Sequence, residues 1–150
     1  MRVAVASDHA GFELKELLKS HMETLGYELV DVGTHSTDPV DYPDFAEKLA
    51  LAIRDGHAER GVLLCGSGVG ANVAANKVPG IRAGICHDPY SAHQGVEHDD
   101  IQVLVLGARI IGSEVAKDLV KIFLEAQYTG EDRHARRLAK VIAIEERYRT

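Results

Sequence analysis

The segment LLCGSGVGANVAANK, residues 63–77, joins an apolar run to a glycine-rich turn and then to a helix-like stretch. Three glycines follow the cysteine at alternate positions, at Gly66, Gly68 and Gly70. Glycine tolerates positive φ and allows close approach, so successive N–H groups can face one concavity. The turn is therefore suited to an anion, because the start of the helix behind it adds partial positive charge.

Short β-rich runs alternate with helical periods along the rest of the chain, and the predicted strands are almost entirely apolar. Such strands are typical of a parallel sheet that helices cover on both faces. We therefore expect an α/β fold with one doubly wound, Rossmann-like domain over residues 1–150. Its five-stranded parallel sheet is predicted to have the order 2-1-3-4-5. The last helix, about residues 133–148, places Leu138, Val141 and Ile142 on one side and is expected to pack on a partner subunit.

The composition argues against several classes of protein. The chain has 150 residues, 45% of them apolar, and a net charge of −6 from 17 basic and 23 acidic residues. An acidic chain is a poor default binder of nucleic acid or of an anionic membrane, and no run approaches the roughly 20 apolar residues of a membrane helix. Two cysteines, Cys65 and Cys86, are too few for a disulfide framework, so we expect a cytoplasmic protein.

The predicted strand order places a ligand site at one point of the sheet. In doubly wound folds, ligands bind beyond the carboxyl ends of the strands, where the strand order reverses. For this order the reversal lies between the first and third strands. It would bring SDHAG, residues 7–11, beside CGSGVG, residues 65–70, and both are short polar or glycine turns.

Cys65 lies at the mouth of the glycine turn and allows two interpretations. It can be a small core residue at the end of a buried strand. Alternatively, its thiolate can remove a proton from a carbon next to a carbonyl, while the turn N–H groups and the Ser67 hydroxyl hold the enediolate oxygen. Cys86 also ends a strand, but no glycine turn follows it, and we interpret it as a core residue.

Three other clusters could carry chemistry. Asp8 and His9 follow the first strand and are either a turn or helix cap or a pair that binds sugar hydroxyls. His98, in the acidic run EHDD, is either part of a solvated surface or a proton donor. Arg133 and Arg137 share one helix face and are either solvated or a phosphate site, and their distance along the chain from the turn suits the pocket of a partner subunit.

Two other ligand classes fit the sequence poorly. Gly66, Gly68 and Ala71 match a dinucleotide fingerprint, with Asp88 as the ribose-binding acid, but the turn follows the third strand rather than the first. A metal site is not expected, because no compact ligand spacing is found among His87, Asp88, His93 and His98.

Several motifs together carry a resemblance to a known family: SDHAGFELK, DVGTHSTDPVDYPD, LLCGSGVG, AANKVPGIRAGIC, EHDD and GEDRHARR. With these motifs in this order, the chain closely resembles the type B ribose-5-phosphate isomerases over about residues 2–147. The resemblance implies a homodimer or a dimer of dimers, with active sites built from two subunits. It also implies reversible conversion of ribose 5-phosphate to ribulose 5-phosphate without a metal or an organic cofactor.

The resemblance also implies roles for individual residues. Cys65 matches the catalytic base of the cysteine-bearing branch, His98 matches the residue that opens the sugar ring, and Ser67 stands where many members have threonine. The remaining matches are to substrate-binding positions, namely Asp8, His9, Tyr42, Gly66, Gly68, Val69, Gly70, Asp99, Arg109, Arg133 and Arg137.

The chain departs from the family pattern at a few positions. Ala71 stands where another branch has a glutamate base, and Glu131 and Asp132 stand where a glycine is commoner. Asp99 replaces an asparagine, and a carboxylate cannot donate the hydrogen bond of the amide. The sugar preference is therefore open: an isomerase of erythrose, allose or galactose phosphate is one alternative, and a non-catalytic nucleotide- or sugar-phosphate-binding subunit is a second.

Overall fold

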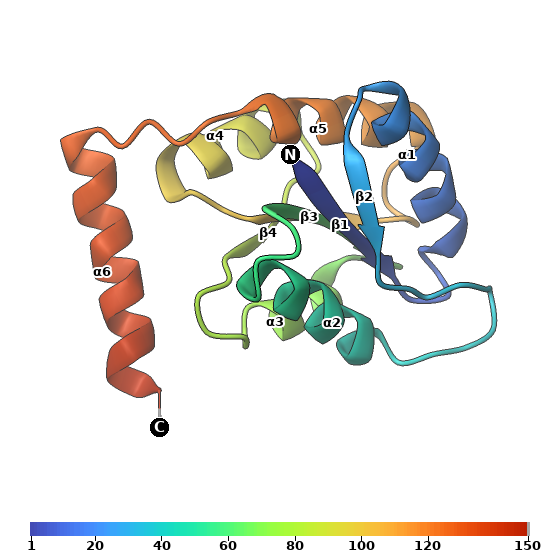
Figure 1. The fold of residues 1–150 in the computed structure, drawn as a ribbon, viewed down its shortest axis with the longest axis horizontal. Coiled ribbons are helices and arrows are strands. Elements are labelled where there is room, and N and C mark those ends of the chain that lie inside the picture. The colour runs from blue at the N-terminus through green and yellow to red at the C-terminus, as the bar shows by residue number, and fades with distance from the viewer. Residues whose placement is uncertain (150) are drawn as a thin grey trace.

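The computed structural model describes residues 1–149 and has a central sheet with helices on both sides (Figure 1). Its elements, in chain order, are β1 (Arg2–Ser7), α1 (Phe12–Thr24), β2 (Glu28–Asp31), α2 (Tyr42–Arg54), β3 (Arg60–Cys65), α3 (Val69–Ala75), β4 (Ala83–Ile85), α4 (Pro89–Asp99), β5 (Val103–Gly107), α5 (Ser113–Glu125) and α6 (Asp132–Tyr148). All four strand pairings are parallel, which confirms the predicted α/β class. Within residues 1–149, every helix is too short or too polar to span a bilayer.

The strand order is β2-β1-β3-β5-β4, so the predicted order 2-1-3-4-5 is wrong at one edge. The last two strands exchange places for a physical reason. All five residues of β5 are buried, whereas the three residues of β4 are only half-buried. A strand that is apolar on both faces is more stable in the interior of the sheet, and the short strand with a central glycine takes the edge.

The observed order also satisfies the handedness of βαβ connections. The chain crosses from β3 to β4 through α3 and returns from β4 to β5 through α4. Because the two connections run in opposite directions across the sheet, right-handed crossovers require their helices to lie on opposite faces. Figure 1 shows α3 beside α2 on one face, and α4 beside α5 and α1 on the other.

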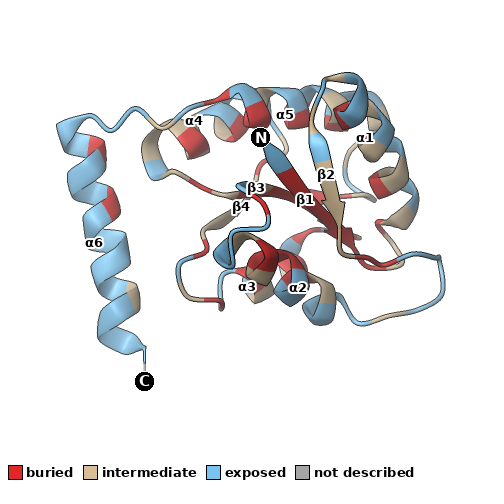
Figure 2. Ribbon diagram, viewed as in Figure 1, coloured by how far each residue is buried: buried red, intermediate tan, exposed pale blue. Residues whose placement is uncertain are grey.

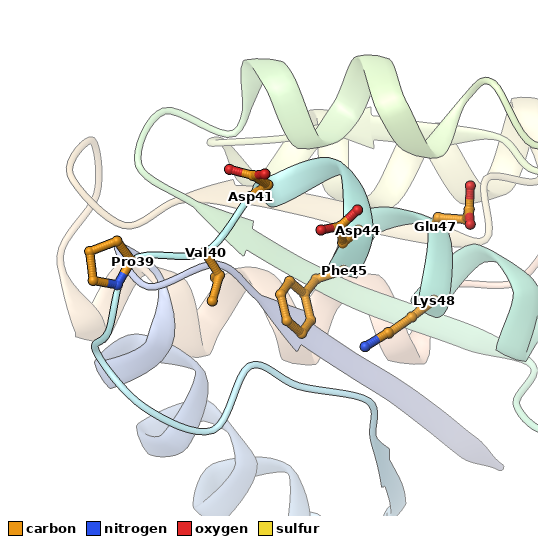
Figure 3. A pocket seen from close by; sticks show the side chains of 7 residues that line it. All are labelled: Pro39, Val40, Asp41, Asp44, Phe45, Glu47 and Lys48. Carbon is orange, nitrogen blue, oxygen red and sulfur yellow. The ribbon is translucent and has the colours of Figure 1, made fainter.

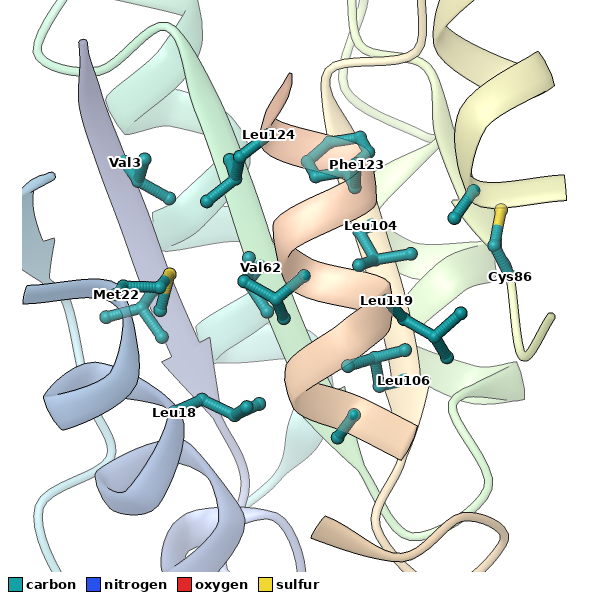
Figure 4. Packing of buried hydrophobic residues seen from close by; sticks show 14 of the residues in the cluster. Val3, Leu18, Met22, Val62, Cys86, Leu104, Leu106, Leu119, Phe123 and Leu124 are labelled. Carbon is teal, nitrogen blue, oxygen red and sulfur yellow. The ribbon is translucent and has the colours of Figure 1, made fainter. Parts of the chain in front are cut away.

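Each face of the sheet has its own apolar core. On the face of α1, α4 and α5, side chains from the central strands pack against Leu18, Met22, Leu119 and Phe123, all fully buried (Figure 4). On the other face, α2 and α3 contribute mostly small residues, Ala46, Ala50, Ala71 and Ala75 among them, around Leu49 and Leu63. Burying each large apolar side chain contributes about 1.5–3 kcal/mol, so these two layers hold the strand ends in place.

The C-terminal helix α6 stands at one side of the layered body (Figure 1) and is exposed over most of its surface (Figure 2). Near its start, His134 and Leu138 are buried, and α6 contacts α4 there. Further along, the Glu145 carboxylate accepts the Gly80 N–H at 3.1 Å. Val141 and Ile142, which continue the side that begins with Leu138, are 47% and 37% exposed.

Candidate functional site

The carboxyl ends of β1 and β3 lie side by side, as the sequence predicts. The N–H of Asp8 donates to the Leu64 carbonyl at 3.2 Å, and the Asp8 carboxylate accepts the Gly11 N–H at 3.1 Å. A Cβ on Gly11 would lie 2.8 Å from the Leu64 Cβ, so only glycine allows this approach. The predicted juxtaposition of SDHAG and CGSGVG is therefore confirmed, because it depends on β1 and β3 and not on the order of the last two strands.

The glycine turn holds the Cys65 thiol at the start of α3. Gly68 has a φ of +87°, which favours glycine, and its N–H donates to Cys65 Sγ at 3.2 Å. The Val69 N–H donates to Ser67 Oγ at 3.2 Å. The first N–H groups of α3, that of Gly70 among them, have no partner within the helix. The Cys65 thiol, 5% exposed, thus lies beside the N–H groups that begin α3.

Two further predicted residues, Tyr42 and Arg109, border this turn, and His9 contacts the segment before α2. A Cβ on Gly70 would lie 2.6 Å from the Tyr42 ring, so the ring rests directly on the Gly70 backbone. The Val40 N–H donates to His9 Nδ1 at 3.1 Å, which leaves His9 Nε2 to carry the hydrogen of a neutral imidazole. The Arg109 N–H donates to the Gly66 carbonyl at 2.9 Å and brings the guanidinium beside Gly66.

These residues form what we call the turn group: Asp8, His9, Tyr42, Cys65, Gly66, Ser67, Gly68, Val69, Gly70 and Arg109. A second set forms what we call the α4–α6 group: His98, Asp99, Arg133 and Arg137. His98 lies in the last turn of α4, and its ring stacks on that of His134 with centroids 3.9 Å apart. Arg133 and Arg137 lie on α6 within three residues of His134, near this stack.

The structure does not bring the two groups together within one chain. Cys65 ends β3 at the carboxyl edge of the sheet. The helix α4 starts at this edge and runs back about 16 Å over its 11 residues, so His98 lies near the amino edge. Arg82, just before β4, fixes the end of α4 there, because its side chain donates to the carbonyls of Asp99 and Asp100 at 3.0 and 2.8 Å.

Two residues that contact His98 were not predicted as part of the site, and a third, His87, contacts Gly107 beside the glycine turn. Gln94 Nε2 lies 2.9 Å from His98 Nδ1, and the spacing of four residues on one helix could have indicated this pair. His134 is 2% exposed, and its Nδ1 lies 2.8 Å from Thr129 Oγ1. His87 Nε2 accepts the Gly107 N–H at 2.9 Å. No sequence pattern links His134 to His98 or His87 to Gly107, because both contacts join separate elements.

Burial and neighbouring charges set the protonation of the buried groups. Burial lowers the pKa of His134, and the positive charges of His98 and Arg133 lower it further. Cys86 lies in the apolar core, as predicted, and burial raises the pKa of its thiol to about 11, with a smaller contribution from Asp88. Among residues 1–149, no cluster of three or more His, Cys, Asp or Glu side chains could hold a metal ion.

A hollow of about 480 Å³ lies at the start of α2, next to the turn group (Figure 3). Its wall carries three carboxylates, Asp41, Asp44 and Glu47, against the single ammonium of Lys48. A negatively charged wall repels a phosphate ester, and no predicted catalytic residue lines the hollow. The hollow is therefore poorly suited to a sugar phosphate.

The sequence matches the family described as Ribose/Galactose Isomerase over residues 3–141. The chain belongs to this family. It is 44% identical over 146 residues to Ribose-5-phosphate isomerase B of Escherichia coli K12, with 97% of each chain covered. It is 42% identical over 134 residues to D-erythrulose-4-phosphate isomerase of Pectobacterium atrosepticum, with 87% of this chain and 86% of that protein covered.

Solved structures of the ribose/galactose isomerase family agree with the fold. Ribose-5-phosphate isomerase B of Clostridium thermocellum superimposes with a TM-score of 0.97 at 44% identity, over 99% of this chain and 100% of that chain. The family match covers both the turn group and the α4–α6 group, because both lie within residues 3–141.

Proposed function

We propose that this chain interconverts ribose 5-phosphate and ribulose 5-phosphate by proton transfer between C1 and C2 of the open-chain sugar. The observation that carries the proposal is the Cys65 sulfur, held by the Gly68 N–H at the ligand-binding edge of the sheet. An aldose–ketose isomerisation needs a base and donors for one oxygen, and the turn group has both. The relatives that act on sugar phosphates support this substrate class.

In the proposed mechanism, Cys65 is the base. It takes a proton from C2 of the aldose, which leaves a cis-enediolate whose O1 accepts hydrogen bonds from the glycine turn and the Ser67 hydroxyl. The hydroxyl proton of O2 then passes to O1, and Cys65 returns its proton to C1 to give the ketose. A positioned general base contributes about 10²–10⁴-fold, and each donor to the oxyanion contributes about 10²–10³-fold. Asp8, His9, Tyr42 and Val69 contact the sugar from the same edge of the sheet. This chemistry moves only protons, so it requires neither a metal nor an organic cofactor.

We further propose that the site is completed by the α4–α6 group of a second copy, so that the functional unit is a homodimer. His98 would open the furanose, Asp99 would contact the sugar, and Arg133 and Arg137 would bind the 5-phosphate of the partner's site. Within one chain, Cys65 lies at the carboxyl edge of the sheet and His98 near the amino edge, and this separation supports the arrangement. The exposed side of α6, with Val141 and Ile142, offers apolar surface that packing on a second copy would bury.

A second candidate function is isomerisation of another aldose phosphate. It rests on Asp99 at the place of the family's usual asparagine and on the similarity to an isomerase of D-erythrulose 4-phosphate. We expect kcat/KM to be highest for ribose 5-phosphate in a panel of aldose phosphates with four to six carbons. A higher value for a four- or six-carbon substrate would select the second candidate. An Asp99→Asn variant should then shift the ratio toward ribose 5-phosphate.

The base is tested with Cys65→Ala, which should abolish isomerisation while the protein keeps its fold. The loss should be about 10²–10⁴-fold in kcat, with binding of ribose 5-phosphate retained in calorimetry. Cys86→Ala is the matched control, because its thiol is buried in the core and should not affect kcat. Near-normal turnover by Cys65→Ala would reject the assignment. Calorimetric binding of NAD in place of the sugar phosphate would favour a nucleotide-binding protein.

A further inference from the structure

His87 lies where β4 ends and β5 continues. The register pairs Ala83 with Val103 and Ile85 with Val105, so residue 87 stands opposite Gly107. At this position β4 is no longer a strand, and the imidazole replaces the missing backbone partner. Its Nε2 accepts the Gly107 N–H at 2.9 Å. Unlike a backbone carbonyl, this acceptor can be removed by changing one side chain.

The protonation state of His87 suits this contact. An imidazole accepts a hydrogen bond only when it is neutral, with its hydrogen on the other ring nitrogen. Burial lowers the pKa of His87, although the nearby charge of Asp88 opposes this effect. The backbone of His87 is also well fixed, because Asp88 caps α4 by accepting the Ser91 N–H at 2.8 Å.

Gly107 transmits the position of His87 to the glycine turn. A Cβ on Gly107 would lie 2.5 Å from the Ser67 carbonyl oxygen, so Gly107 is pressed against the peptide that links Ser67 to Gly68. The next two residues bind the same segment: Ala108 N–H donates to the Cys65 carbonyl at 2.8 Å, and Arg109 N–H donates to the Gly66 carbonyl at 2.9 Å.

We infer that His87 is a positioning residue for the isomerase reaction: by holding Gly107, it fixes the glycine turn that binds the reacting oxygen and the Arg109 guanidinium beside Gly66. The expected effect of His87 on kcat rests on the proposed function. The structural part of the inference, the capture of the Gly107 N–H by the imidazole, does not depend on which reaction the chain performs.

Three variants separate this role from simple packing. In His87→Gln, the side-chain oxygen can take the place of Nε2, whereas in His87→Asn the oxygen stops one bond short. We expect kcat for ribose 5-phosphate to fall about tenfold in His87→Asn with KM changed less than kcat, since the Gly107 N–H is left without a partner. His87→Gln should retain kcat within about threefold. His93→Asn, the same substitution at a half-exposed histidine on α4, should leave kcat unchanged.

Hydrogen exchange of the Gly107 amide, followed by NMR in the same variants, tests the contact without an activity assay. The amide should be protected in the native protein and in His87→Gln, and exchange faster in His87→Asn. Equal protection in all three, or equal kcat in His87→Asn and the native protein, would overturn the inference. If neither the native protein nor any variant isomerises ribose 5-phosphate, but the Gly107 amide exchanges as expected, the proposed function fails. The structural part of the inference then stands.

Discussion

The guanidinium of Arg133 is held by the carboxylate of Glu131, two residues before it. Both side chains are more than half exposed, so their ion pair is worth about 0–1 kcal/mol. In the proposed function, Arg133 binds the 5-phosphate of the substrate, and the phosphate must compete with Glu131 for the same donors. In the proposed function, Glu131 therefore weakens substrate binding without contacting the substrate.

Glu131→Gln should lower KM for ribose 5-phosphate about two- to fivefold, because it removes the charge that competes with the phosphate. The value of kcat should not change, since Arg133 is far from the reacting carbons in the proposed site. Steady-state kinetics at low ionic strength measure both values. Asp132→Asn makes the same change of charge one residue later and should leave KM near its original value. An unchanged or higher KM in Glu131→Gln would argue against Arg133 as a phosphate ligand.

At the scale of elements, α1 and β2 are joined by a buried ion pair. Lys15 is fully buried on α1, and its ammonium lies 2.7 and 2.8 Å from the two oxygens of Asp31 at the end of β2. Burial acts to raise the pKa of Asp31, but the hydrogen bonds from Lys15, Lys19 and the Gly33 N–H hold it below its usual value. The carboxylate thus also fixes the start of the loop that follows β2.

Replacing Lys15 by methionine should destabilise the protein by about 3 kcal/mol, because it leaves a partly buried carboxylate with only Lys19 as a charged partner. Urea unfolding at neutral pH measures the loss. Lys117→Met, which removes an ammonium from a surface pair with Glu114, should cost less than about 1 kcal/mol. The stabilisation from Asp31 is complete above its unfolded pKa and disappears as pH falls through its lower folded pKa. An equal loss in both variants would show that the pair contributes only as a surface contact.

The contact between α4 and α6 includes the buried His134, whose lowered pKa favours its neutral form. His134 stacks on His98, and burial lowers its pKa below the unfolded value, so the unfolded chain binds the proton first as pH falls. This part of the stability is therefore complete above about pH 6.5 and decreases below it. The native protein should lose more stability between about pH 7 and pH 5.5 than His134→Asn does. Urea unfolding at both pH values measures the difference, with exposed His57→Asn as the control. Equal pH dependence in all three proteins would contradict the prediction.

For the whole molecule, the sequence predicted the class of fold and the position of the turn group but not the full strand order. The adjacency of β2, β1 and β3 can be predicted from the apolar runs and the short connections between them. The register of β1 and β3 places Asp8 beside Leu64. The order of β4 and β5 could not be predicted, because both strands have apolar sequences. The deciding difference is small: β4 has three half-buried residues, and β5 has five buried ones.

The site was predicted only as far as local sequence determines it. The glycine turn, its cysteine and the polar residues after β1 are local features, and the structure brings them together. The position of His98 relative to Cys65 depends on the length and direction of α4, which no motif encodes. The contacts of His87 and His134 join residues on separate elements. Residue types could therefore be identified from the sequence, and the family resemblance implied active sites built from two subunits. The contacts that hold the α4–α6 group together could not be predicted, because they join residues on separate elements.

The division of the proposed site between two subunits leads to a prediction that only an assembly of two copies can satisfy. Cys65→Ala lacks the base of the turn group, and a chain with Arg133→Ala and Arg137→Ala lacks the phosphate donors of the α4–α6 group. Each variant alone should be inactive at substrate concentrations below KM. In a dimer of one chain of each kind, one of the two sites combines the intact turn group of one chain with the intact α4–α6 group of the other.

Equal amounts of the two variants, unfolded together and refolded, should recover about a quarter of the native activity, because half of the dimers are mixed and each has one intact site. A mixture of Cys65→Ala with a chain that carries all three substitutions is the control and should stay inactive, since no site can then be complete. Activity is measured with ribose 5-phosphate, and sedimentation of the mixture verifies that dimers form. If dimers form and no activity returns, the two groups do not act in one shared site, and the α4–α6 group must serve a purpose other than substrate binding.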